Sequence, residues 1–174
     1  GRQPARGCAD SGVVCVYNGE LYAFDDVRRA LVDDGHAIAG SCDTDVVAHL
    51  YEKHGDAMVD KMRGMFAFIV WDAKARSLVV GRDRYGMKPL FYAVGKDALV
   101  IASEAKAIFA SGLVQPVIDE DALEDLFTLG YPIPQRTMFR GVFALSPAHV
   151  AVVDDAARKK IAATASAGVR MTLL

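Results

Sequence analysis

The sequence lacks any excess of charge and any long apolar run, and both absences exclude classes of protein. The 174 residues carry 20 Lys and Arg against 22 Asp and Glu, and the net charge of −2 argues against nucleic acid or an anionic membrane as the main partner. No apolar run approaches the roughly 18 residues that a membrane span needs. The first residues are polar and include Pro4, so no signal peptide is expected there.

Cysteine is also scarce, and no pattern of metal ligands stands out. The three cysteines are Cys8, Cys15 and Cys42, and an odd number without a secretory signal favours reduced thiols in a cytoplasmic protein. Their spacing fits no zinc motif. His49 and His54 are five residues apart and do not share a helix face, so both are expected to be structural or surface residues. No metal site is therefore predicted.

The sequence does contain apolar strands, and 52% of its residues are apolar. Strands are predicted at 13–17, 36–39, 65–71, 77–82, 90–94, 98–102 and at two short stretches within 142–153. Helices are predicted at about 24–34, from 43 onward, at 58–62, after a Ser103 cap and after an Asp119 cap. The run 65–71 is apolar throughout, so that strand should be covered on both faces. Strands and helices do not alternate regularly, which favours an α+β fold of packed sheets with helices outside.

Two further features of the sequence limit the chemistry that it can carry. It has no glycine-rich phosphate loop of either standard type. Arg82, Asp83 and Arg84 form a charged cluster that invites an anion-binding interpretation. Because Gly86 and Pro89 shape a turn around them, a structural ion-pair loop is the favoured interpretation.

The pair Asn18-Gly19 is the most informative local feature. After an apolar strand, Asn-Gly ordinarily predicts a hairpin turn, because both residues tolerate positive φ. Here Phe24, Val27 and Leu31 follow at helical spacing, so the pair is predicted where a strand gives way to a helix. A side-chain amide and a free backbone N–H at such a place suit an oxyanion site. A purely structural turn remains the alternative.

Five segments together carry a resemblance to a known family. They are Asn18-Gly19-Glu20-Leu21-Tyr22, Asp43-Thr44-Asp45-Val46, 64–68 with Trp71-Asp72, 82–92 and 103–107. In this order they resemble the glutamine amidotransferase domain of the glutamine-hydrolysing asparagine synthetases, a class II amidotransferase. The match runs from about Gly1 to Val153, and its last two motifs resemble asparagine synthetase more than the purine or hexosamine amidotransferases.

The resemblance implies a fold and a domain division. The fold would be a four-layer αββα sandwich of antiparallel sheets flanked by helices, the N-terminal-nucleophile (Ntn) hydrolase type, incomplete at the N-terminus. Residues 1–154 would be a partial amidotransferase domain. Residues 155–174 would be a tail or a truncated junction to a synthetase domain.

The resemblance also implies roles for single residues. In the family, an N-terminal cysteine thiolate attacks the glutamine amide, with its own α-amino group as base, and ammonia leaves. The Asn18 amide and the Gly19 N–H would stabilise the oxyanion. Asp43 would accept the substrate's α-ammonium, and Glu20 would line the same pocket. The alternatives are a helix N-cap for Asp43 and an exposed, solvated acid for Glu20.

The sequence departs from the family at the nucleophile. Gly1 stands first here, and Cys8 and Cys15 are internal, so this chain alone is expected to be inactive as a glutaminase. The implied function is ammonia supply for ATP-dependent asparagine biosynthesis from aspartate, with L-glutamine and the synthetase domain of the same protein as partners. No cofactor is expected in this domain, since ATP and Mg would bind the synthetase domain. A homodimer, and a non-catalytic glutamine-binding or protein-interaction module of the same fold, stay open as alternatives.

Overall fold

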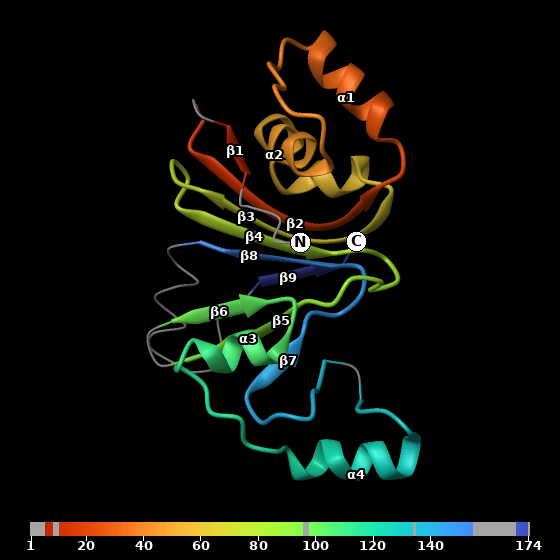
Figure 1. The fold of residues 1–174 in the computed structure, drawn as a ribbon, viewed down its shortest axis with the longest axis vertical. Coiled ribbons are helices and arrows are strands. Elements are labelled where there is room, and N and C mark those ends of the chain that lie inside the picture. Colours follow the sequence, from red (N-terminus) through yellow and green to blue (C-terminus); the bar gives the residue numbers. More distant parts are fainter. Residues whose placement is uncertain (1–5, 9–10, 96–97, 134, 155–169, 174) are drawn as a thin grey trace. The chain divides into compact units, whose positions relative to one another are not determined.

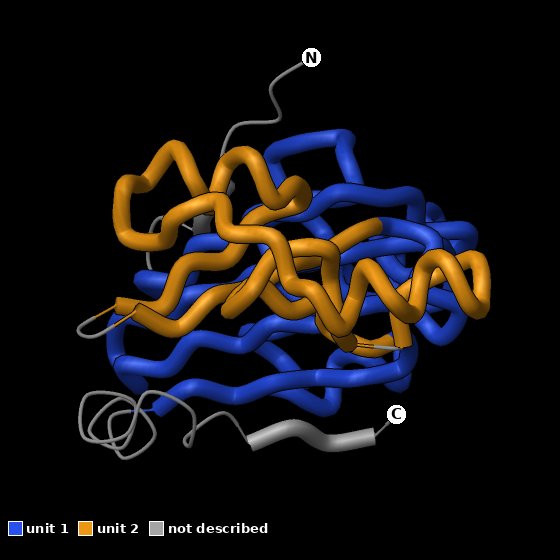
Figure 2. The backbone as a smooth tube through the Cα atoms, turned by 90° about the horizontal axis from the view of Figure 1, so that it is seen from below, with its two compact units in different colours: residues 1–88, 147–155, 169–174 blue, residues 89–146, 156–168 orange. Residues whose placement is uncertain are grey.

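The computed structural model describes residues 6–8, 11–95, 98–133, 135–154 and 170–173. The chain divides into two compact units, coloured separately in Figure 2. Unit 1 comprises Gly1–Lys88, Pro147–Asp155 and Val169–Leu174, and unit 2 comprises Pro89–Ser146 and Ala156–Gly168.

The secondary structure consists of short helices and mostly short strands, labelled in Figure 1. The helices are α1 (Phe24–Asp33), α2 (Asp43–His54), the 3-10 helix η1 (Gly55–Lys61), α3 (Ala105–Ala110) and α4 (Glu120–Leu129). The strands are β1 (Arg6–Cys8), β2 (Val13–Leu21), β3 (Gly64–Asp72), β4 (Ser77–Arg82), β5 (Phe91–Val94), β6 (Leu99–Ala102), β7 (Val142–Ala144), β8 (His149–Val153) and β9 (Arg170–Leu173).

Unit 1 is built on a six-stranded antiparallel sheet in the order β1-β2-β3-β4-β8-β9, with α1 and α2 on one of its faces (Figure 1). Burial alternates along β2: Cys15 and Tyr17 are buried, whereas Val14 and Val16 are exposed. This alternation follows from the period of two in a strand. The buried face packs in one core with α2, whose apolar residues Val46, Val47, Leu50 and Tyr51 are all buried, as the sequence predicts.

The central strand of unit 1 confirms the prediction made from its apolar run. The successive residues Phe66, Ala67 and Phe68 of β3 are each no more than 3% exposed. Successive side chains of a strand point to opposite faces, so both faces are covered at this position.

Unit 2 is built on a three-stranded antiparallel sheet, β6-β5-β7, with its own small core around Ala93, Ile108 and Val142. Asp119 caps α4 as predicted, because its Oδ1 accepts a hydrogen bond from the Ala122 N–H at 3.3 Å. The predicted Ser103 cap is wrong, since α3 has Glu104 as its N-cap. Both units thus combine antiparallel strands with helices, which confirms the α+β class.

One predicted strand does not form, and the predicted tail is described only in part. No strand forms at 36–39, because the His36 N–H bonds to the Leu31 carbonyl and the Ile38 N–H to the His36 carbonyl, which keeps this segment in a local loop. The predicted tail lies outside the described residues from 155 to 169, and residues Arg170–Leu173 pair with β8 as an edge strand. Among the helices described, none has the length and apolarity to cross a membrane.

Candidate functional site

Three of the four predicted site residues lie in the last part of β2, and the fourth opens α2. Asn18 and Glu20 are exposed on the same face of the strand, and Gly19 and Asp43 are half-buried. Asn18 pairs with Ala67 and Gly19 with Phe66 inside the β2–β3 ladder. The alternative of a turn is therefore wrong. The predicted passage from strand to helix does occur, between Leu21 and Phe24, but the pair itself lies inside the strand.

Glycine is required at position 19 by close approach of the two strands. A Cβ on Gly19 would collide with the Met65 carbonyl oxygen and would lie 2.7 Å from the Cα of Phe66. The same holds for Gly64 on β3, because a Cβ there would collide with the Glu20 carbonyl oxygen. The two glycines therefore let the backbones approach more closely than side chains would allow.

The direction of the Gly19 N–H follows from its ladder partner. The Phe66 N–H donates to Asp83 Oδ2 at 3.1 Å, and the Phe66 carbonyl accepts from the Asp83 N–H at 2.9 Å. Phe66 thus turns both backbone groups toward the β4 side. Residues of an antiparallel strand point these groups to alternate sides, so Gly19, opposite Phe66, points its N–H away from β3.

The neighbours of Gly19 show the same alternation. The Tyr22 N–H donates toward the β3 side, to the Arg63 carbonyl at 2.8 Å, whereas the Leu21 N–H donates to Asp43. Gly19 and Leu21, two residues apart, therefore direct their N–H groups to the same outer edge of β2. Within the part of the chain that the structure describes, β1 covers this edge only as far as Cys15.

Asp43 bridges this edge to α2. Its Oδ2 accepts the Leu21 N–H at 2.6 Å, while Cys42 is the N-cap of α2 and makes no side-chain cap bond. The N-cap alternative for Asp43 is therefore wrong: Asp43 is the first helical residue, where the helix dipole favours a carboxylate. A carboxylate offers about four lone-pair sites, so it can accept a further donor at the same edge.

Tyr17 is buried on β2, within the strand predicted at 13–17, and no pattern in the sequence indicated the environment of its hydroxyl. Its hydroxyl is buried and has no hydrogen-bond partner among the described residues. Burial raises the pKa of Tyr17 far above its usual value, and the Asp43 carboxylate raises that pKa further. The phenol therefore stays neutral at any physiological pH.

The charged loop after β4 is structural, as predicted, although backbone hydrogen bonds hold it. Asp83 is 1% exposed, and its carboxylate accepts the N–H groups of Phe66, Tyr85, Met87 and Lys88 at 2.9 to 3.3 Å. The Arg82 guanidinium donates to the Gly86 and Lys88 carbonyls at 2.6 and 2.7 Å. Both side chains are committed to the fold of the loop.

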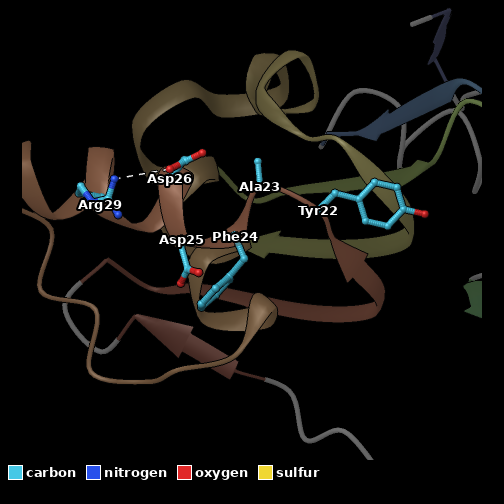
Figure 3. Close-up of a pocket in the computed structure, with 6 residues that line it drawn as sticks. All are labelled: Tyr22, Ala23, Phe24, Asp25, Asp26 and Arg29. Carbon is cyan, nitrogen blue, oxygen red and sulfur yellow. Dashed lines mark hydrogen bonds and ion pairs between the residues drawn. The ribbon is translucent and has the colours of Figure 1, made fainter.

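A surface pocket of about 360 Å³ lies at the start of α1 (Figure 3). Its lining residues are Tyr22, Ala23, Phe24, Asp25, Asp26 and Arg29. The Asp26–Arg29 ion pair at 3.5 Å is exposed, which makes its energetic contribution small. None of the four predicted site residues lines this pocket, so the pocket is separate from the predicted site.

Side chains able to hold a metal gather elsewhere in unit 1. His36, His49 and Glu52 each offer one ligand atom, and these atoms lie within 4.8 Å of one another. The sequence pattern argued against a metal pair of His49 and His54 and gave no signal for His36, which is 13 residues from His49 and lies in a loop.

Similarity to known proteins extends over most of the chain. The chain is 39% identical over 155 residues to asparagine synthetase [glutamine-hydrolyzing] 3 of Bacillus subtilis, which covers 86% of this chain and 25% of that protein. It is 37% identical over 140 residues to the amidase chyE of Penicillium rubens, covering 80% and 20%. The chain thus spans a quarter or less of the length of these curated relatives.

Solved structures share the fold at low sequence identity. Glutamine phosphoribosylpyrophosphate amidotransferase from B. subtilis superposes with a TM-score of 0.61 at 18% identity, over 99% of this chain and 31% of that one. A glutamine aminotransferase class-II domain protein from Silicibacter pomeroyi gives 0.51 at 12% identity, over 97% and 70%. These neighbours confirm the expected fold class. A family model described as a glutamine amidotransferase domain matches residues 1–163, and the chain belongs to this family, in the class II form found in asparagine synthetases.

Proposed function

We propose that this chain binds L-glutamine as the ammonia-supplying domain of an asparagine synthetase-like protein. The observation that carries the proposal is the shared edge of β2, to which Gly19 points its N–H and at which the Asp43 carboxylate lies. In this class of reaction, a glutamine carries a positive α-ammonium group and develops a negative oxyanion. The Asp43 carboxylate can accept from the first, and the Gly19 N–H can donate to the second.

The spacing along the edge supports glutamine as the ligand. The N–H groups of Gly19 and Leu21 are two residues apart on one strand, roughly 7 Å. The α-nitrogen and the side-chain carbonyl carbon of an extended glutamine are four bonds apart, roughly 5 Å. A glutamine lying along the edge can therefore place its ammonium group at Asp43 and its carbonyl oxygen near Gly19. Asn18 would supply the second donor, and Glu20 would line the exposed side.

The thiolate of this chemistry is not supplied by the described cysteines. Cys15 is fully buried on the core face of β2. Cys42 donates its thiol proton to Asp45 Oδ2 at 3.0 Å and carries no free α-amine. Cys8 is internal as well. We therefore expect this chain by itself not to release ammonia from glutamine.

The use of the ammonia belongs to other parts of the proposed protein. Relatives of this domain are called asparagine synthetases and amidases, so the domain alone does not fix the acceptor. The asparagine synthetase motifs favour transfer to aspartate, driven by ATP and Mg in a synthetase domain of the same protein. Reduced thiols at Cys15 and Cys42 are consistent with a reducing, cytoplasmic location.

Calorimetric titration of the chain with L-glutamine tests the proposal. Asp43→Asn keeps an oxygen for the Leu21 N–H and removes the charge, so the affinity for glutamine should fall about tenfold or more. Asp60→Asn, an exposed acid on η1, is the matched control and should bind as the unchanged chain does. Equal affinity of the unchanged chain and Asp43→Asn would overturn the assigned site. Ammonia release by the unchanged chain would overturn the expected inactivity, whereas glutaminase activity of the full-length gene product would exclude the non-catalytic alternative.

A further inference from the structure

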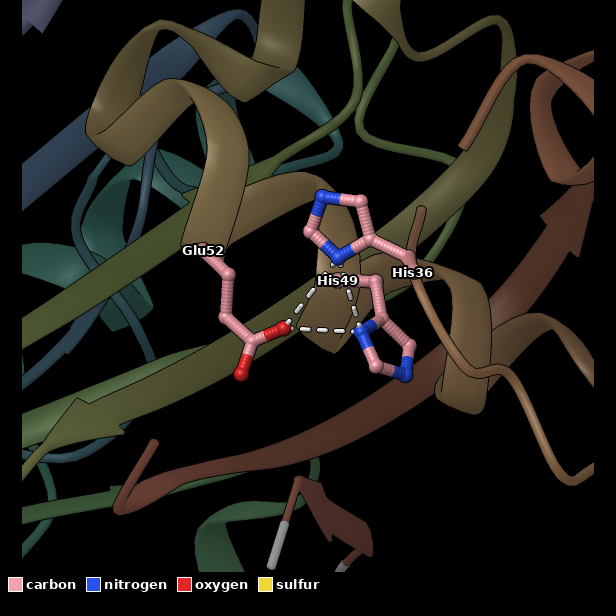
Figure 4. Close-up of side chains that lie close together, drawn as sticks. All are labelled: His36, His49 and Glu52. Atoms are coloured by element: carbon pink, nitrogen blue, oxygen red, sulfur yellow. Dashed lines mark hydrogen bonds and ion pairs between the residues drawn. The ribbon is translucent and has the colours of Figure 1, made fainter. Parts of the chain in front are cut away.

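We propose that His36, His49 and Glu52 form a binding site for a divalent metal ion, and that this ion is Zn²⁺. The site uses none of the residues assigned to glutamine, so it stands or falls independently of the proposed function. Figure 4 shows the two imidazole rings and the carboxylate, with dashed lines that join one atom of each.

Two of the three side chains come from one helix face. His49 and Glu52 are three residues apart on α2, a spacing that places side chains side by side. His36 reaches them from the loop between α1 and α2. All three are largely buried, with 21% of the His36 side chain, 13% of the His49 side chain and 16% of the Glu52 side chain exposed. An ion could thus enter from solvent yet be held in a partly desolvated site.

The loop that carries His36 is fixed to both helices. Asp34 pairs with Lys53 of α2, and the His36 N–H bonds to the Leu31 carbonyl of α1 at 3.0 Å. Gly35 between them has a φ of +91°, which glycine adopts at little cost. The imidazole of His36 is therefore presented by an anchored backbone.

The separations of the three atoms suit a tetrahedral ion. Zn²⁺ binds histidine nitrogen and carboxylate oxygen at about 2.0–2.2 Å, which places tetrahedral ligand atoms about 3.3 Å apart. His36 Nδ1 lies 3.3 Å from His49 Nδ1 and 3.6 Å from Glu52 Oε2. The His49 Nδ1–Glu52 Oε2 separation of 2.7 Å would have to open by about 0.6 Å, a small rotation for a glutamate side chain.

Proton counting also favours an ion over hydrogen bonds alone. His49 Nδ1 makes two short contacts, to His36 Nδ1 and to Glu52 Oε2. A ring nitrogen carries either one N–H or one lone pair, so the two contacts compete for the same group. A cation bound between the three atoms would instead accept one lone pair from each of them.

The donor set identifies the class of metal. Two imidazoles and one carboxylate suit borderline ions such as Zn²⁺, and the same three-ligand set leaves a fourth position for water. The carboxylate also offsets part of the charge of the ion. Bound there, the metal would join the loop after α1 to α2.

Titration of the chelator-treated and dialysed chain with Zn²⁺ tests the proposal. We expect one ion per chain and a rise of the melting temperature with Zn²⁺, because an ion that binds the folded state stabilises it. His36→Ala and Glu52→Gln should each weaken binding by more than about tenfold, since loss of even an outer-shell partner typically costs about 10–100-fold. With Co²⁺ in place of Zn²⁺, visible absorption of a tetrahedral ion should appear, without bands from a thiolate ligand.

Two matched variants control for other ligands. His54→Gln changes a histidine of the same helix outside the cluster, and Cys42→Ser removes a thiol near the start of α2. Both should bind one Zn²⁺ as the unchanged chain does. The proposal is overturned if no saturable binding occurs, if His36→Ala and Glu52→Gln bind as tightly as the unchanged chain, or if Cys42→Ser abolishes uptake. Circular dichroism of each variant separates loss of the site from loss of the fold, and Glu52→Gln is the variant nearest in shape.

Discussion

Asp43 Oδ2 accepts the backbone N–H of Leu21 at 2.6 Å and so joins the first turn of α2 to the last residue of β2. The bond spans 22 residues of sequence and satisfies an N–H that the β2–β3 ladder leaves unpaired. It therefore has a structural role as well as the role proposed in binding glutamine, and substitutions can separate the two.

Two substitutions of Asp43 should separate its structural role from its proposed role in binding. Asp43→Ala leaves the Leu21 N–H without its acceptor and should lower the free energy of unfolding by about 1–3 kcal/mol. Asp43→Asn keeps an acceptor and should cost clearly less, although it removes the charge that the glutamine ammonium would meet. Urea unfolding of both variants measures the difference, and equal losses would show that charge, rather than the hydrogen bond, stabilises this edge.

Gly19→Ala should be strongly destabilising, because the added methyl would meet the Met65 carbonyl and Phe66. Overpacking of this kind typically costs about 1–3 kcal/mol, and a collision with backbone places the cost at the upper end. Gly95→Ala is the matched control, since its Cβ would meet only the Ala98 carbonyl oxygen at 3.4 Å. Thermal melts of the two variants should differ by several degrees. Similar melting temperatures would contradict the close approach of β2 and β3.

Asp83→Asn should be among the most damaging single changes in unit 1. The carboxylate accepts four backbone N–H groups, and an amide would turn its own donor toward some of them. A loss of about 3 kcal/mol or more in the free energy of unfolding is expected. Glu124→Gln, an exposed change on α4, should stay within about 0.5 kcal/mol. A mild effect of Asp83→Asn would show that the loop does not depend on this carboxylate.

Tyr17→Phe should modestly stabilise the chain near pH 7, because it removes a buried hydroxyl that has no partner among the described residues. Its pKa is raised in the folded state, so the native chain keeps the phenol neutral while the unfolded chain ionises above about pH 10. Stability from this group is thus fully present below pH 10 and is lost as the pH rises further. Urea midpoints should therefore favour Tyr17→Phe more strongly at pH 11 than at pH 7.

The Asp34–Lys53 pair should stabilise the chain at neutral pH and lose this effect in acid. The hydrogen bond and the charge of Lys53 lower the pKa of Asp34 below its usual value. A lowered carboxyl pKa contributes stability above the unfolded pKa, about 3.9, and that contribution is lost as the pH falls through the folded pKa. The difference in urea midpoint between the unchanged chain and Asp34→Asn should therefore disappear on titration from pH 7 to pH 2. A difference that persists at pH 2 would assign the effect to something other than this pair.

Local patterns predicted the regular elements well. The apolar periodicity of 24–34, the continuous apolar run 65–71 and the cap at Asp119 each correspond to an observed element. These signals succeed because burial and capping are decided within a few residues. The strand predicted at 36–39 failed because the backbone of His36 bonds to the preceding helix, and an apolar stretch does not reveal such a local bond.

The candidate site depended on relations between distant segments. The local pattern pointed to Asn18 and Gly19, a family resemblance added Glu20 and Asp43, and the chemical roles of all four stay predictions. The outward direction of the Gly19 N–H depends on the ladder register with Phe66, which the sequence does not display. The cluster of His36, His49 and Glu52 could not be predicted from sequence spacing, because a loop brings His36 to the two residues of α2.

The position of Gly19 inside a continuous ladder has a consequence for the proposed chemistry. Its neighbours Asn18 and Glu20 are paired to β3, so the peptide dipole of Gly19 is clamped on both sides of the residue. If the same N–H lay in a flexible loop, the loop would have to become ordered when negative charge develops on a bound carbonyl oxygen. In β2 the Gly19 N–H is already aligned before any ligand binds. No further reorganisation of this donor is therefore needed when the oxyanion forms.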